Sequence, residues 1–257
     1  MSGPSADVPG DSEGNWQSEP TGSTADLPVV DPAAVASASA SGEREHGDRD
    51  GDGDEHERDG TEPIVGVLLA AGTSSRYGAA NKLLVAVEGE PIVRRAAATL
   101  CRSAVDRVVT VLGYEAERIG PVLDDIDDCD PVFVENPAYK QGQSTSVRTG
   151  VSAASELGAG AVVIALGDMP TVDPTSIDAL VDAYRADAGD ALAAAFDGRR
   201  GNPVLFDRRY FDALGDVSGD VGGREILPNS DRSALVETGD RGVLGDIDTE
   251  ADLDEYR

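Results

Sequence analysis

From residue 63 onward, short apolar runs alternate with stretches in which apolar residues recur at helical spacing. Residues 64–70 and 161–166 are almost wholly apolar, which is typical of strands covered on both faces. Strands that alternate with helices are joined by long crossovers, and this favours parallel pairing. The pattern therefore predicts an α/β fold of three layers, with a mostly parallel central sheet between helices.

Further strands are predicted from shorter apolar runs. Residues 107–112 and 132–135 fit this description, and residues 191–196 and 203–206 are two more candidates.

Helices are predicted from capping residues and from apolar residues at helical spacing. Pro91 is expected to open one helix, and an apolar stripe through residues 147–157 marks another. Asp173 followed by Pro174 is a typical N-cap and first residue. Thr249 and Asp252 predict a capping box before a last helix.

Residues 1–62 have a different composition, rich in Asp, Glu, Gly and Ser. Such a segment buries too little apolar area to offset the entropy of ordering its backbone, so we expect it to be disordered. The folded domain is expected at residues 63–257. Because His46 and His56 both lie in the extension, the predicted domain has no histidine, which excludes Ser-His-Asp catalysis and histidine-bound metals.

The chain has a formal net charge of −28, so nucleic acid would be repelled rather than bound. Lys82 and Lys140 are the only lysines, whereas arginines are common. Acid excess with few lysines suggests adaptation to high salt, where carboxylates keep a surface hydrated. A lysine retained against such a bias is a candidate for a specific role.

Apolar runs are too short for a membrane span of ~18 residues, and a secretory signal is not evident, so we expect a cytoplasmic protein without membrane contact. Cys101 and Cys129 are too few for a disulfide framework or a four-ligand zinc site. We expect them to be two small buried thiols.

The loop after the first strand carries residues suited to phosphate. It reads Ala71-Gly72-Thr73-Ser74-Ser75-Arg76, and Lys82 follows. Small residues let backbone N–H groups surround phosphate oxygens, while Arg76 and Lys82 supply positive charge. The spacing matches neither a Walker loop nor the dinucleotide-binding glycine pattern.

The strand at residues 161–166 is followed by Gly167-Asp168-Met169-Pro170. Ligands of open α/β sheets lie at the carboxyl ends of the strands, which is where Asp168 is expected. Its carboxylate either caps a turn or binds a divalent cation held against substrate phosphates. The neighbouring phosphate loop favours the metal.

Taken in order, several motifs resemble the molybdenum cofactor cytidylyltransferase family, within the MobA-like NTP transferase superfamily. They are residues 69–78 with Lys82, 136–148, 167–170, 201–206, 219–224 and 246–249. The resemblance spans residues 64–257 and implies a Rossmann-like, glycosyltransferase-A-like nucleotidyltransferase fold. It also implies transfer of CMP from CTP to the phosphate of molybdopterin-type cofactor, with release of pyrophosphate and a requirement for Mg²⁺.

The resemblance also implies roles for individual residues. Catalysis would depend on Arg76, Lys82 and Asp168. The nucleotide would contact Leu69, Ala70, Ala71, Gly72, Arg76, Lys82, Gln143, Ser144, Arg148 and Asp168. The acceptor would lie near Arg199, Asn202, Asp220 and Arg224, although Asp220 is equally suited to capping a helix. Mg²⁺ would bind Asp168 together with Asp246 or Asp248, between which the sequence does not choose.

Two alternatives fit the same motifs. A related nucleotidyltransferase would use GTP or ATP on another phosphorylated acceptor. A non-catalytic protein would bind the pterin cofactor and deliver it to a client molybdoenzyme, and such a protein would tolerate loss of Lys82. Ala71, where guanylyl-transferring relatives commonly carry glycine, resembles the cytidylyl pattern.

Overall fold

The computed structural model describes residues 27–32, 62–74, 77, 80–126, 129–219 and 226–254. Their main feature is a sheet of eight strands in the order β1-β10-β8-β9-β7-β2-β5-β6. The strands are β1 (Val29–Val30), β2 (Ile64–Ala70), β5 (Arg107–Leu112), β6 (Val132–Glu135), β7 (Ala161–Leu166), β8 (Ala191–Phe196), β9 (Arg199–Asp207) and β10 (Ser233–Glu237). Neighbouring strands pair in parallel except at β9, which is antiparallel to both β7 and β8. The predicted mostly parallel sheet is confirmed.

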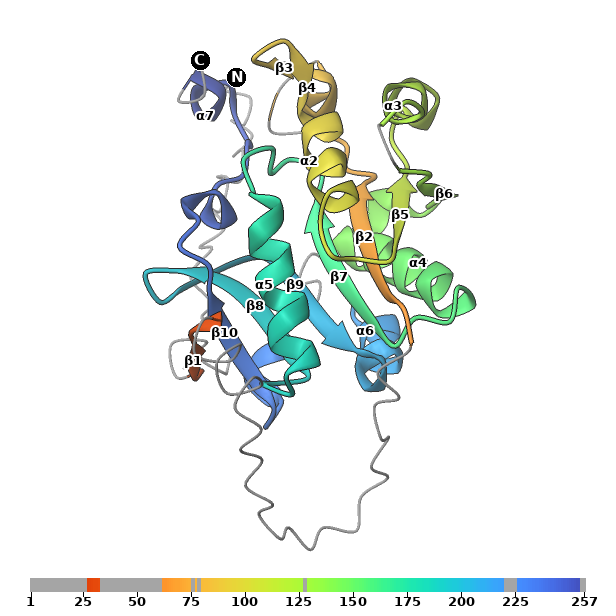
Figure 1. The fold of residues 1–257 in the computed structure, drawn as a ribbon. Helices are drawn as coiled ribbons and strands as arrows, with labels where there is room; N and C mark the ends of the chain where they lie inside the picture. The colour runs from red at the N-terminus through yellow and green to blue at the C-terminus, as the bar shows by residue number, and fades with distance from the viewer. Residues whose placement is uncertain are drawn as a thin grey trace, which may run out of the picture.

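Helices cover both faces of this sheet (Figure 1). They are α2 (Ile92–Cys101), α3 (Ala116–Leu123), α4 (Gln143–Glu156), α5 (Pro174–Arg185), α6 (Phe211–Asp216) and α7 (Glu250–Asp254). One core contains buried residues of α2, α3 and α5, and a second contains buried residues of α4 and α6. A small hairpin of β3 (Ala86–Val87) and β4 (Glu90–Pro91) precedes α2.

Strand β2 shows why the central strands are apolar throughout. Leu68 and Ala70 face the core under α2 and α5, whereas Val67 and Leu69 face the core under α4. Successive side chains of a strand point to opposite faces, so a strand covered on both sides has no polar positions. On the second face α4 lies very close, because a Cβ added to Gly150 would be 2.3 Å from Val67 Cγ1.

The predicted helix starts agree with the structure. Asp173 is the N-cap of α5, and its carboxylate accepts hydrogen bonds from the Thr175 backbone N–H at 2.9 Å and from the Thr175 hydroxyl at 2.7 Å. The capping box at α7 also forms, since Asp252 accepts from the Thr249 N–H and Thr249 Oγ1 accepts from the Asp252 N–H.

The structure differs from the expected disorder of residues 1–62 at residues 27–32. Val29 and Val30 pair in parallel with Leu235 and Val236 of β10, and the Leu235 N–H donates to the Pro28 carbonyl. This short apolar segment pairs with the backbone groups at the edge of β10, which would otherwise be left without strand partners. The average composition of residues 1–62 is acidic, so it did not indicate a strand within them. Residues 1–26 and 33–61, which include His46 and His56, lie outside the described residues.

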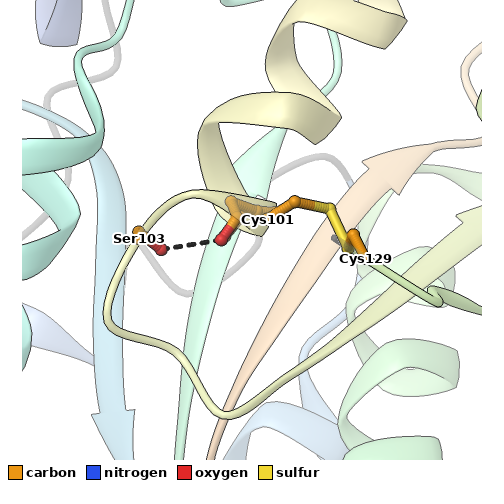
Figure 2. Close-up of a disulfide and its surroundings, with 4 residues drawn as sticks. Cys101, Ser103 and Cys129 are labelled. Atoms are coloured by element: carbon orange, nitrogen blue, oxygen red, sulfur yellow. Dashed lines mark hydrogen bonds between the residues drawn. A yellow bond between two sulfur atoms is a disulfide. The ribbon is translucent and has the colours of Figure 1, made fainter. Parts of the chain in front are cut away.

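The prediction of two separate thiols is wrong, because Cys101 and Cys129 form a disulfide (Figure 2). Cys101 ends α2, and Cys129 lies just before β6. Their Cα atoms are 5.5 Å apart, within the usual range for a disulfide, although 28 positions separate them in sequence. The number of cysteines in a sequence can exclude a disulfide framework or a four-cysteine zinc site. It does not indicate whether the fold brings two particular cysteines together.

In the part of the chain that the structure describes, no helix has the length and apolar character needed to cross a membrane.

Candidate functional site

The site lies where β2 and β7 end. These strands are parallel neighbours, with Leu69 opposite Leu166. Just beyond the pairing, the Gly167 N–H donates to the Leu69 carbonyl at 3.0 Å. The loops that leave the two strands therefore start side by side, at the edge where open α/β sheets bind ligands.

The loop after β2 is closed by side chains. Asn81 is the N-cap of the short 3₁₀ helix η2 (Lys82–Leu84), and its side chain accepts from the Leu83 N–H at 3.1 Å. The Ser74 hydroxyl donates to Asn81 Oδ1 and accepts from the Lys82 N–H, at 3.3 and 3.1 Å. Ser74 and Asn81 are both buried, so this clasp fixes the backbone position of Lys82.

The Lys82 ammonium lies between two carboxylates. Nζ is 2.7 Å from Asp168 Oδ2 and 2.7 Å from Asp248 Oδ1, and only 12% of the lysine side chain is exposed. Burial acts to lower the pKa of Lys82, but the charges and hydrogen bonds of Asp168 and Asp248 outweigh it, so the pKa is raised. Lys82 therefore joins the loop after β2 to the segments that carry Asp168 and Asp248.

A third carboxylate completes the cluster. One oxygen each from Asp168, Asp246 and Asp248 can be chosen so that all three lie within 4.8 Å of one another. Ile247, which is fully buried, separates Asp246 from Asp248, and its N–H donates to the Asp168 carbonyl at 3.0 Å. Burial, followed by the charges of Asp168 and Asp248, raises the pKa of Asp246.

This donor set fits a hard divalent cation. Mg²⁺ binds carboxylate oxygens together with substrate phosphates and water. Asp168 Oδ1 is buried and has no hydrogen-bond partner among the described residues, so it remains available as a ligand atom. The structure brings both Asp246 and Asp248 to Asp168, where the sequence left the two as alternatives.

The expected nucleotide-binding residues near β2 surround the start of the loop. Leu69, Ala70 and Ala71 are buried, whereas Gly72 is exposed, and a Cβ added to it would meet no atom of the described residues within 4 Å. The space beside Gly72 is therefore open on the side where a side chain would project.

The segment before α4 packs against the same place. A Cβ added to Gly113 would be 2.8 Å from Ala71 Cβ and 2.9 Å from Tyr139 Cβ. Gly142, with a φ of 113°, turns the chain into α4, which begins at the exposed Gln143. Ser144 is buried, and its N–H donates to the Gly219 carbonyl.

Arg148 is positioned differently from the other expected nucleotide contacts. Its Nε donates to the Gly215 carbonyl at 2.6 Å and its Nη2 to the Val217 carbonyl at 3.1 Å. The guanidinium thus joins α4 to the end of α6 rather than to the Lys82 cluster. Its role towards a nucleotide stays a prediction.

Two of the expected acceptor residues lie at the start of β9. Arg199 is exposed, and Asn202 lines a small cavity with Leu166 and Met169, near the end of β7. Because β9 is antiparallel to β7, its first residues reach the same edge as the last residues of β7. Arg76, Asp220 and Arg224 lie outside the described residues.

Ser74, Asn81 and Ile247 were not singled out from the sequence as parts of the site. Asn immediately before Lys82 is a helix-cap signal that would have indicated the turn holding the lysine. Ile247, flanked by two acids, would have indicated a strand-like alternation with both carboxylates on one side.

Comparison with known proteins identifies the MobA-like NTP transferase family over most of the sequence and leaves the cytidylyltransferase subtype a prediction. The model of the MobA-like NTP transferase domain matches residues 66–234.

Curated relatives are similar over most of their length. The purine catabolism protein PucB of Bacillus subtilis is 32% identical, over 76% of this chain and 96% of its own. The nicotine blue oxidoreductase of Paenarthrobacter nicotinovorans is 30% identical, over 72% and 92%. A probable molybdenum cofactor guanylyltransferase of Natronomonas pharaonis is 30% identical, over 75% and 96%.

Solved structures share the fold. A nucleotidyl transferase from Methanothermobacter (Mth528) is 21% identical with a TM-score of 0.63, covering 76% of this chain and 97% of its own. Rv0371c from Mycobacterium tuberculosis, in complex with manganese, is 23% identical with a TM-score of 0.59, covering the same shares.

Proposed function

Because this chain belongs to the family of MobA-like NTP transferase domains and is a nucleotidyltransferase, we propose that it moves CMP from CTP to the phosphate of molybdenum cofactor. The products are a cytosine dinucleotide form of the cofactor and pyrophosphate. A client molybdoenzyme would receive the modified cofactor.

One observation carries this proposal: the contact of Lys82 with Asp168. Lys82 follows the loop suited to phosphate, and Asp168 follows β7, which pairs with β2 in the sheet. Lys82 Nζ and Asp168 Oδ2 are 2.7 Å apart. A triphosphate bound by the first loop would therefore lie within reach of the carboxylate cluster.

The reaction needs positioning and charge rather than a proton acceptor. An oxygen of the acceptor phosphate forms a bond to the α-phosphorus of CTP, and the bond from that phosphorus to the β-bridging oxygen breaks. The acceptor phosphate is already ionised, so it needs no general base. Lys82 and the loop N–H groups would hold the triphosphate and stabilise the negative charge that develops on pyrophosphate.

Asp168, Asp246 and Asp248 would hold Mg²⁺, since three carboxylates with an unpartnered buried oxygen suit that ion. When bound, Mg²⁺ neutralises charge on the triphosphate oxygens.

The choice of CTP is supported by Ala71. It is buried against the segment near Tyr139, at a place where guanylyl-transferring relatives commonly have glycine. The probable guanylyltransferase among the relatives favours GTP instead, which makes the nucleotide the first variable to test.

The test incubates the purified full chain with Mg²⁺, molybdenum cofactor and each of CTP, GTP, ATP and UTP. Pyrophosphate is measured, and the dinucleotide product is identified by mass spectrometry. We expect pyrophosphate and a cytosine dinucleotide with CTP.

Other outcomes separate the alternatives. A guanine or adenine dinucleotide would reject the cytidylyl subtype and retain the reaction class. Tight cofactor binding without pyrophosphate from any nucleotide would reject catalysis in favour of a delivery protein.

A further inference from the structure

Lys82 Nζ contacts one carboxylate oxygen of Asp168 and one of Asp248. The 2.7 Å contacts to Asp168 Oδ2 and Asp248 Oδ1 are short, charge-assisted hydrogen bonds. Only 12% of the Lys82 side chain is exposed, so the lysine is a buried component of the site rather than a mobile surface side chain.

A divalent cation cannot use the same pair of oxygens at the same time. Mg²⁺ binds carboxylate oxygens at about 2.1 Å, and Mn²⁺ takes the same kinds of oxygen ligand. An ion bound to both oxygens would lie almost where the ammonium lies, and two positive charges at that separation repel strongly. An ion that binds both Asp168 Oδ2 and Asp248 Oδ1 therefore competes with the ammonium, whereas an ion held through Asp168 Oδ1, which has no partner in the described part of the chain, would leave Lys82 in place.

The ammonium also has a reason to be there. Three carboxylates whose oxygens lie within 4.8 Å of one another repel each other. Lys82 offsets part of the negative charge and keeps the segment of Asp246 and Asp248 against Asp168.

We propose that Lys82 is a displaceable counter-cation: it holds the Asp168 and Asp248 oxygens until a divalent ion takes them, and is then released to the phosphate loop. This inference rests on the proposed function, in which the loop after β2 holds a triphosphate that the released ammonium can then contact. It makes binding of the metal and availability of Lys82 to the triphosphate one linked event.

The first experiment follows the lysine itself in the unaltered protein. With ¹⁵N-lysine labelling the chain gives two side-chain signals, from Lys82 and Lys140. Ammonium protons held by two carboxylates exchange slowly with water. After chelation of divalent ions we expect slow exchange at Lys82, and at saturating Mg²⁺ without nucleotide an exchange roughly tenfold faster.

Lys140 is the internal control. It is exposed, with Nζ 5.7 Å from the centre of the Tyr139 ring, and its exchange should be fast with or without Mg²⁺. Unchanged slow exchange at Lys82 while Mg²⁺ is bound would overturn the proposal, because the ion would then lie beside the lysine.

The second experiment measures Mn²⁺ affinity without nucleotide, by the electron paramagnetic resonance of the free ion. Lys82→Met should bind Mn²⁺ at least roughly tenfold more tightly than the unaltered protein, because the competing charge is removed. Lys140→Met should bind as the unaltered protein does, and adding Asp168→Asn to Lys82→Met should abolish the gain. Equal affinity in Lys82→Met and the unaltered protein would contradict competition.

Neither experiment contains a nucleotide or an acceptor, so each stands apart from the product assay. If Mg²⁺ displaces Lys82 but no dinucleotide product forms, the displacement stands and the proposed function is rejected. If the dinucleotide product forms while Lys82 stays in contact with the carboxylates, the proposed function stands and the displacement is rejected.

Discussion

The backbone N–H of Ile247 donates a 3.0 Å hydrogen bond to the carbonyl oxygen of Asp168. These residues lie far apart in the sequence, and this bond fixes the register between the two segments. Ile247 itself is buried in the core, so its neighbours Asp246 and Asp248 point towards the Asp168 side chain. The metal-binding geometry proposed above therefore depends on an apolar side chain that touches no ligand.

Replacing Ile247 with Ala should lower both stability and metal affinity. Truncation of a buried isoleucine costs about 2–5 kcal/mol in the free energy of unfolding. Mn²⁺ affinity should also fall, because the segment of Asp246 and Asp248 loses its anchor. The control is Ile177→Ala in α5, which is equally buried and should cost similar stability in urea titrations with unchanged Mn²⁺ affinity.

Asp168→Asn and Lys82→Ala should each lose most turnover. Removing one group that stabilises transition-state charge commonly lowers the rate by about 10²–10³. Both variants should retain the circular dichroism of the unaltered protein, and pyrophosphate release measures the loss. Asp182→Asn, an exposed position of α5, is the matched substitution, and its rate should equal that of the unaltered chain. Full activity in either site variant would reject the assignment.

The disulfide should contribute to stability and leave the reaction unaffected. Joining cysteines that are 28 positions apart stabilises the folded state by about 3–4 kcal/mol through the entropy of the unfolded chain. Cys101→Ser with Cys129→Ser should lower the free energy of unfolding by that amount and retain turnover, because the bond lies at the amino-terminal edge of β5 and β6, opposite the site. Reductant should destabilise the unaltered protein alone; equal sensitivity of both would mean that the bond does not form.

Asp173 should stabilise the protein in a way that depends on pH. The Thr175 hydroxyl, and then the Thr175 backbone N–H, lowers the pKa of this N-cap carboxyl below its ordinary value of 3.8. A lowered folded-state pKa contributes stability above 3.8, and that contribution is lost as the pH falls through the lowered value.

Asp173→Ala should therefore cost about 1 kcal/mol at pH 7, and the difference from the unaltered protein should shrink below pH 3.8. Urea unfolding across this range gives the comparison. Asp182→Ala, later in the same helix, controls for the loss of one acid; an equal effect there would mean that the cap is not the cause.

Local signals predicted the parts of the fold that depend on local chemistry. The apolar runs of residues 64–70 and 161–166 are β2 and β7 as expected, and Asp173 caps α5. Helix α3 was not predicted, because it starts after Glu115 in a left-handed conformation and contains Pro121. Strand β10 was also missed, since its five residues gain strand character only by pairing with β8.

The site divides in the same way. Lys82 and Asp168 were expected together because the carboxyl ends of neighbouring parallel strands share an edge. The sequence offered Asp246 and Asp248 as alternatives, and their joint approach to Asp168 depends on a hydrogen bond between distant segments. The reversal of β9 and the Cys101–Cys129 bond likewise depend on the complete topology.

The reversed direction of β9 has a consequence for how such a protein changes over evolution. The turn at Asp197 and Gly198 projects at the rim of the sheet, just before Arg199 and Asn202. Insertions there would reshape the surroundings of an incoming partner molecule, while the strands that carry Lys82 and Asp168 keep their register. Changes in the sequence of this one exposed turn can thus alter which acceptor molecule binds, without moving Lys82 and Asp168.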